Sequence, residues 1–136
     1  MIVVDASVLT AVLLDDGDRA TTAAIEWMRD DPHWVVPEHA VIETVHAVRG
    51  GWLGGRISRE QLGAAVQTLL DWRLDVWPTA PLLPRVVALA HNATAYDAAY
   101  LALAEELSTS LITLDRRLAA VPGIRCTVRV PPADRE

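Results

Sequence analysis

The first five residues, MIVVD, place one acidic residue directly after a short apolar run. A run this short, closed by a charge, is typical of a buried strand and too short for a core helix. The next apolar residues recur at helical spacing: Val8, Leu9, Val12 and Leu13. A strand that leads straight into a helix is the opening half of a β–α–β unit. We therefore expect Asp5 to lie at the carboxyl end of a buried strand.

The same alternation of short strands and longer helices continues along the chain. It predicts further strands at 34–37, 74–78, 110–114 and 126–130. It predicts helices at 19–29, 38–49, from 58 onward, 81–92 and 94–107, with a short helix after Asp115. Gly50-Gly51 is expected to end one helix, and 52–55 to form a flexible connector. The order predicts a three-layer α/β/α sandwich around a mostly parallel sheet, with a domain at 1–130 and a frayed tail at 131–136.

Composition narrows the classes of protein that fit. With 136 residues, 51% of them hydrophobic, the chain can bury the core of one domain. The net charge is −6 and all twelve basic residues are arginine, so a nucleic-acid partner would need bound cations to offset its phosphates. The single cysteine, Cys126, excludes an internal disulfide and a cysteine-based zinc site. No apolar run approaches the ~20 residues of a membrane span and no basic leader is present, so we expect a cytoplasmic protein without a membrane partner.

Four acidic residues lie beside or inside apolar segments: Asp5, Glu43, Asp97 and Asp115. Taken singly, Asp5 can begin a turn, Asp97 can belong to a capping box opened by Thr94, and Asp115 can cap the helix that follows it. In parallel sheets, however, ligands bind at the carboxyl ends of strands, near a switch in strand order. Clustered carboxylates repel one another unless hard cations separate them. Together the four acids indicate a site for Mg²⁺ or Mn²⁺.

The helix that carries Glu43 leaves alternatives open. Its predicted apolar stripe is Val41, Val45 and Val48. Glu43 then faces either solvent or a polar cleft. His39, Glu43 and His46 stand at i, i+4 and i+7, a spacing that can also chelate a transition metal from one helix.

Four segments in order carry a family resemblance. They are IVVDAS at 2–7, E-x-x-H-x-x-R at 43–49, TAYDAAYLALA at 94–104 and LITLDRRL at 111–118. The chain resembles a PIN-domain protein, and specifically a VapC-type toxin ribonuclease of a type II toxin–antitoxin system, from Ile2 to about Val128. The resemblance implies a Mg²⁺- or Mn²⁺-dependent endoribonuclease. It also implies a homodimer, a VapB-like antitoxin as inhibitor, and tRNA or rRNA as substrate.

The resemblance also assigns roles to single residues. It makes Asp5, Glu43, Asp97 and Asp115 the catalytic, metal-binding acids, and Ser7 and Thr113 supporting hydroxyls. Asp5 and Asp97 are the strongest candidates for metal ligands, with Glu43 and Asp115 completing the cage or holding water. His46 stands where asparagine is more usual. Such a site hydrolyses RNA with a metal-activated water.

The surroundings of the acids suggest how partners bind. Arg116 and Arg117 directly follow Asp115, and either can contact RNA phosphates or simply form a solvated helix face. Trp52 and Leu53 in the expected connector suggest a partner or dimer surface. The alternative function is a PIN-like module for dimerisation and antitoxin binding with little or no catalysis. A receiver domain or aspartyl phosphatase is disfavoured, because the chain has neither a second acid beside Asp5 nor any lysine.

Overall fold

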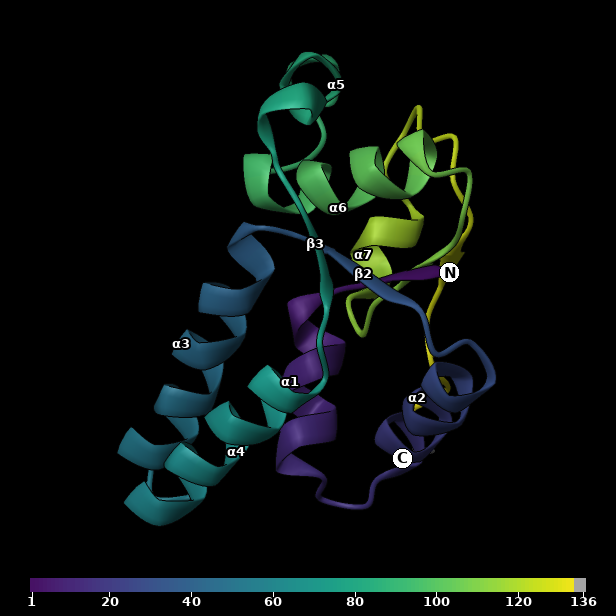
Figure 1. Cartoon of the computed structure of the whole chain (residues 1–136). Helices are drawn as coiled ribbons and strands as arrows, with labels where there is room; N and C mark the ends of the chain where they lie inside the picture. Colours follow the sequence, from purple (N-terminus) through teal and green to yellow (C-terminus); the bar gives the residue numbers. More distant parts are fainter. Residues whose placement is uncertain (134–136) are drawn as a thin grey trace.

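The computed structural model describes residues 1–133, and 134–136, the end of the predicted tail, lie outside the described residues. Within residues 1–133 the chain forms five strands, seven α-helices and one short 3₁₀ helix (Figure 1). The strands are β1 (Ile2–Val4), β2 (Trp34–Pro37), β3 (Asp75–Trp77), β4 (Leu111–Ile112) and β5 (Val128–Arg129). The helices are α1 (Ala6–Leu14), α2 (Arg19–Asp30), α3 (His39–Leu53), α4 (Arg59–Asp71), η1 (Ala80–Leu82), α5 (Leu83–Ala88), α6 (Ala95–Glu106) and α7 (Arg116–Ala119). No helix in this part of the chain is both long and apolar enough to cross a membrane.

All five strands form one sheet in the order β3-β2-β1-β4-β5, and every pair is parallel. The chain builds outward from β1 to β3, then returns across the sheet and adds β4 on the other side of β1. The switch in strand order therefore lies between β1 and β4, where Val4 pairs with Ile112. A parallel sheet opens a crevice for ligands at such a switch, beyond the carboxyl ends of the two strands.

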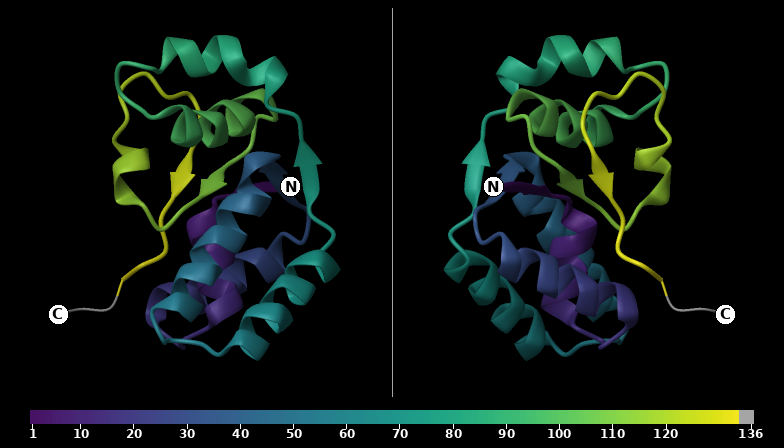
Figure 2. Two further views of the ribbon diagram at one scale, coloured as in Figure 1. Left: turned by 90° about the vertical axis from the view of Figure 1, so that its left-hand side faces the viewer. Right: turned by 90° about the vertical axis from the view of Figure 1, so that its right-hand side faces the viewer.

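Helices cover both faces of the sheet, as a three-layer α/β/α sandwich requires. Figure 1 shows α1 to α4 on one side of the sheet and α5 and α6 on the other, and both views of Figure 2 place α5 outside α6. Because α6 packs between the sheet and α5, every residue from Ala98 to Ala104 is buried. A helix enclosed in this way is apolar on all sides, so it makes a rigid support for the polar residues at its first turns.

The predicted stop at Gly50-Gly51 is wrong, because α3 continues to Leu53. Gly51 is buried in the last turns of α3, and its carbonyl accepts from the Arg56 N–H at 2.9 Å, so the loop after the helix folds back onto it. The chain reverses only at Gly55, whose φ of 79° suits glycine. The first half of the expected flexible connector is thus helix, with Trp52 half-buried under the Arg59 guanidinium.

Another predicted helix also differs from the structure. The helix expected at 81–92 is divided into η1 and α5, and it ends at Ala88. Pro84 lies in the first turn of α5, where its missing N–H removes no helical hydrogen bond. In the expected frayed tail, Pro131 is buried, so at least this residue packs against the domain.

Candidate active site

Asp5 leaves the carboxyl end of β1 at the switch point, and it is buried, with 8% of its surface exposed. Its Oδ2 accepts hydrogen bonds from Ser7 Oγ at 2.8 Å and from Thr113 Oγ1 at 2.6 Å. The two hydroxyls in turn accept from backbone N–H groups, Ser7 from Leu114 at 3.1 Å and Thr113 from Asp115 at 3.0 Å. The network therefore fixes the direction of the Asp5 carboxylate and fastens the loop after β4 to the start of α1.

This carboxylate carries an electrostatic cost. Burial raises the pKa of Asp5, and the two hydroxyl donors offset part of that effect. The negative charge of Glu43 raises the pKa of Asp5 further. Such an environment favours any cation that comes within reach of Asp5.

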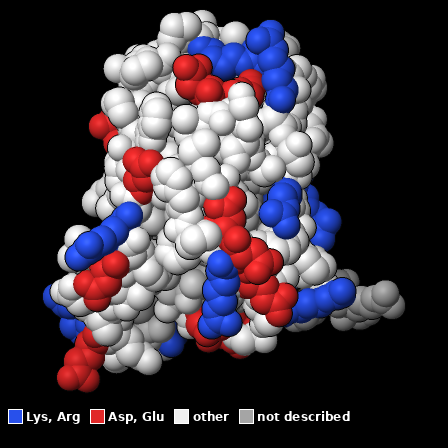
Figure 3. All heavy atoms as spheres, turned by 45° about the vertical axis from the view of Figure 1, so that its right-hand side comes forward, with Lys and Arg blue, Asp and Glu red and all other residues white. Residues whose placement is uncertain are grey.

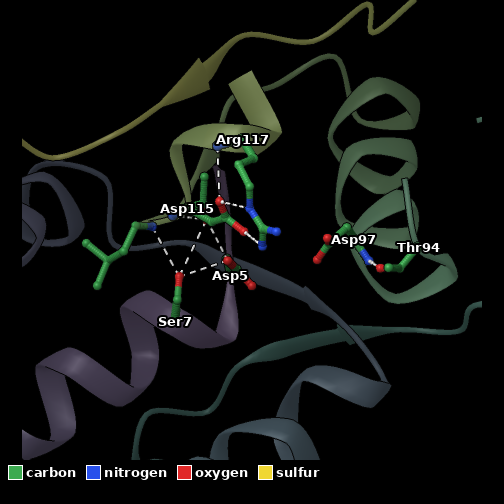
Figure 4. A network of polar contacts seen from close by, with 8 residues as sticks. Asp5, Ser7, Thr94, Asp97, Asp115 and Arg117 are labelled. Carbon is green, nitrogen blue, oxygen red and sulfur yellow. Dashed lines mark hydrogen bonds and ion pairs between the residues drawn. The ribbon is translucent and has the colours of Figure 1, made fainter. Parts of the chain in front are cut away.

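Asp97 faces the same space from the first turn of α6. Its backbone N–H donates to the Oγ1 of Thr94, the N-cap of the helix, at 3.1 Å. Figure 4 shows the Asp97 side chain pointing toward Asp5 and Asp115. Burial raises the pKa of Asp97 first, and the charges of Asp5 and then Asp115 add to it. The negative charges of Asp5 and Asp115 thus act on Asp97 across the switch point.

Asp115 already holds a cationic partner. It is the N-cap of α7, and its Oδ1 accepts from the Arg117 backbone N–H at 3.0 Å. The Arg117 guanidinium binds it in a fork, with Nε to Oδ1 at 3.0 Å and Nη2 to Oδ2 at 2.7 Å. These bonds lower the pKa of Asp115. Arg117 therefore lies at the site, and Arg116 is exposed on the same turn.

Glu43 is connected to the site through a residue that the sequence analysis missed. The buried Tyr100 hydroxyl donates to Glu43 Oε1 at 2.6 Å and accepts from the Ala6 backbone N–H at 3.2 Å. Burial and the neighbouring carboxylates raise the pKa of Tyr100 well above its usual value, so the hydroxyl remains a donor at any ordinary pH. The available signal was a tyrosine inside an otherwise Ala- and Leu-rich helix, because a buried tyrosine hydroxyl needs a partner.

The buried face of α3 differs from the predicted stripe. Its buried residues are Ala40, Thr44, Val48 and Gly51. Val41 and Val45 are only half-buried, and Thr44 occupies a core position instead. Its hydroxyl can be buried because it donates to the Ala40 carbonyl at 2.7 Å. His39 Nε2 lies 4.0 Å from Glu43 Oε1, whereas His46 is exposed. The three residues of the proposed helical chelate do not form a metal-binding group in this part of the chain.

The four predicted acids differ in their readiness to hold a metal ion. Across residues 1–133, no three His, Cys, Asp or Glu side chains are arranged so that they could hold a metal ion by themselves. Mg²⁺, however, is usually held by one or two carboxylates, with water and substrate phosphates as its other ligands. Asp5 and Asp97 fit this pattern, since both have raised pKa values and the charge of Asp5 contributes to the shift of Asp97. Asp115 and Glu43 already accept hydrogen bonds from Arg117 and Tyr100.

The family model for the PIN domain matches residues 2–124. The chain belongs to the PIN-domain family. This PIN-domain protein is also 36% identical to "VapC ribonuclease Mb0985" of Mycobacterium bovis, with 97% of this chain and 99% of the relative covered. The resemblance to VapC-type proteins is therefore confirmed.

Solved structures support the same fold for this PIN-domain protein. Mycobacterium tuberculosis VapC20, titled a sarcin-ricin loop cleaving toxin, superposes with a TM-score of 0.69 at 21% identity, covering 97% of this chain and all 100% of that one. A toxin–antitoxin complex from Klebsiella pneumoniae gives a TM-score of 0.64 at 21% identity, covering 98% and 100% of the two chains. At these identities, the likeness establishes the fold alone.

The surface of this PIN-domain protein lacks a simple basic track on the face drawn in Figure 3. Arginines and acidic side chains are interspersed there over most of the height of the molecule. This agrees with the net charge of −6. Attraction of a polyanion would therefore have to come from individual arginines and from bound cations.

Proposed function

We propose that this PIN-domain protein is an endoribonuclease and the toxin of a toxin–antitoxin pair. The observation that carries the proposal is the buried Asp5 carboxylate at the switch between β1 and β4, which two hydroxyls orient and toward which Asp97 points (Figure 4). The similarity to VapC ribonucleases over nearly the whole chain supports it. We propose tRNA or rRNA as the substrate class.

The cofactor in this proposal is Mg²⁺ or Mn²⁺, held by Asp5 and Asp97. Oxygen-only donors favour these ions over zinc. When bound, such an ion supplies a water of lowered pKa and offsets the charge that develops on the scissile phosphate. Glu43 and Asp115 complete the acidic wall, where their oxygens orient water.

The remaining groups position the reactants. Ser7 and Thr113 keep the Asp5 carboxylate in one orientation, and Tyr100 does the same for Glu43. Arg117 and Arg116 lie where RNA phosphates would pass, and a phosphate can compete with Asp115 for the Arg117 fork. None of these steps requires a histidine as base.

The partners in this proposal are a VapB-like antitoxin and a second copy of the chain. Arg117 on Asp115 illustrates how a guanidinium fits this acidic site, so an antitoxin side chain of the same type can block it. Leu83 and Val87, one turn apart on α5, are exposed apolar residues suited to a homodimer, and Leu53 is exposed separately at the end of α3. Measuring Mn²⁺ affinity with and without the antitoxin tests the first idea, and light scattering of the isolated chain tests the second. Unchanged affinity, or a monomer at all concentrations, would count against them.

The decisive experiment is RNA cleavage. Purified protein is incubated with total tRNA and rRNA plus Mg²⁺ or Mn²⁺, alongside an EDTA control. We expect discrete cuts that disappear with EDTA and in Asp5→Asn and Asp97→Asn. Asp30→Asn is the matched control, because Asp30 is an exposed acid at the end of α2. If folded wild type cuts no RNA and binds no metal, the chain is instead a dimerisation and antitoxin-binding module.

A further inference from the structure

A pocket adjoins the acidic site on its α3 side. It has a volume of about 360 Å³ and is lined by His39, Ile42, Glu43, His46 and Tyr96. Glu43 lines this pocket and also belongs to the candidate site, so the two lie next to each other. A pocket of a few hundred cubic ångströms is large enough for a small planar ligand.

The pocket opens onto a row of aromatic rings. The rings of Tyr96 and His39 have their centroids 5.8 Å apart, and those of His39 and Tyr100 are 5.0 Å apart. Tyr100 is 1% exposed and Tyr96 is 65% exposed, so the row runs from the core to solvent. The inner end of the row donates a hydrogen bond to Glu43. This aromatic row therefore connects an exposed ring directly to the acidic site.

The chemistry of the lining argues for the kind of ligand. Ile42 is 69% exposed beside Tyr96, so the wall is apolar and accessible. No arginine lines the pocket, which excludes it as a simple phosphate site. A nucleobase has two apolar faces that stack on aromatic rings and a polar edge whose N–H groups can donate to a carboxylate such as Glu43.

We propose that this pocket holds an unpaired nucleobase of the RNA, next to the bond that is cut. The proposal rests on the proposed ribonuclease function. Tyr96 immediately precedes Asp97 in the first turn of α6, so a nucleotide whose phosphate lies at Asp97 can reach the pocket with its base. An apolar side chain of a protein would fit the wall, but it would bury the Glu43 carboxylate without offering a donor.

Cleavage kinetics test the proposal. Once the strongest wild-type cut in rRNA or tRNA is mapped, an oligoribonucleotide that spans it serves as substrate. Tyr96→Ala should lower kcat/KM about five- to a hundredfold, the range for loss of one stacked base, whereas Tyr96→Phe should stay near wild type. Leu70→Ala truncates a side chain that is 65% exposed on α4 and is the control for surface truncation. An abasic nucleotide beside the cut should slow the wild type but leave Tyr96→Ala almost unchanged, because coupled groups are non-additive.

A binding assay separates this proposal from the proposed function. A single-stranded oligoribonucleotide with 2-aminopurine loses fluorescence when its base stacks, so it reports the pocket without any cleavage. The Asp97→Asn protein should quench the 2-aminopurine fluorescence, and the double variant Asp97→Asn/Tyr96→Ala should not. This result would support the proposal even if no RNA is cut. If wild type cuts RNA, and Tyr96→Ala and Ile42→Ala both cut RNA and quench 2-aminopurine as wild type does, the pocket proposal is overturned. The proposed ribonuclease function would then still stand. Normal cutting and quenching by Tyr96→Ala, combined with weaker antitoxin binding, would also overturn it and make the pocket a protein contact.

Discussion

Replacing Tyr100 with phenylalanine removes one oxygen atom that serves two partners. In the wild type this hydroxyl donates to Glu43 Oε1 at 2.6 Å and accepts from the Ala6 N–H at 3.2 Å. A hydrogen bond to a charged group contributes about 1.5–3 kcal/mol, and an unsatisfied buried donor costs about 1–3 kcal/mol. We expect Tyr100→Phe to lower the free energy of unfolding by about 3 kcal/mol, a large part of the stability of an ordinary domain.

Urea unfolding followed by tryptophan fluorescence measures this loss. A cost of about 3 kcal/mol moves the midpoint down by roughly 1–2 M urea for a domain of this size. The matched control is Tyr96→Phe, which removes the hydroxyl of an exposed tyrosine from the same helix and should remain within about 0.5 kcal/mol of wild type. Equal midpoints for the two variants would refute the bridging role of Tyr100.

The other predictions concern the acidic site. The pKa of Asp97 is raised above 3.8 in the folded state, so its ionisation lowers the stability of the fold as pH rises above 3.8. Asp97→Asn should therefore raise Tm at pH 7, and this gain should vanish below pH 3.8. A gain that persists at low pH in the thermal scans would contradict this. Adding Mn²⁺ should raise the Tm of wild type more than that of Asp97→Asn, since only a ligand that binds the folded state stabilises it, and EDTA should reverse the effect. Thr94→Ala removes the N-cap of α6 and should cost about 1 kcal/mol, whereas Thr94→Ser should restore most of it in urea unfolding. Arg117→Ala should raise the pKa of Asp115 toward its ordinary value in a carboxyl NMR titration, and an unchanged pKa would mean that the Arg117 fork does not form in solution.

The sequence predicted the fold well where the local pattern decides the structure. Short apolar runs ending in Asp5 and Asp115 indicated two strands that each stop at an acid, and the sheet order puts β1 beside β4. The pattern failed where packing overrides local preference. Two adjacent glycines weaken a helix, but Gly51 is buried and its carbonyl accepts from the Arg56 N–H, so tertiary packing carries α3 past both of them.

The network around Asp5 could not be derived from spacing. Thr113 lies 108 positions from Asp5, and only the parallel pairing of β1 with β4 brings its hydroxyl to Oδ2. The role of Tyr100 was hidden for the same reason, because its partners lie on α3 and at the start of α1. A pattern of residue types can name the acids, but their hydrogen-bond partners depend on the tertiary arrangement.

Asp5, Asp97 and Asp115 carry unequal electrostatic costs, and the difference suggests a division of roles. Asp115 has its own guanidinium and a lowered pKa, so its charge is already compensated in the absence of any other cation. Burial raises the pKa of both Asp5 and Asp97, and neighbouring carboxylates raise it further. A divalent cation binds most favourably where negative charge is least compensated. It would therefore offset the charges of Asp5 and Asp97 rather than that of Asp115. In the proposed function these two unfavourable charges have a use, because the stability that they cost would become affinity for the ion.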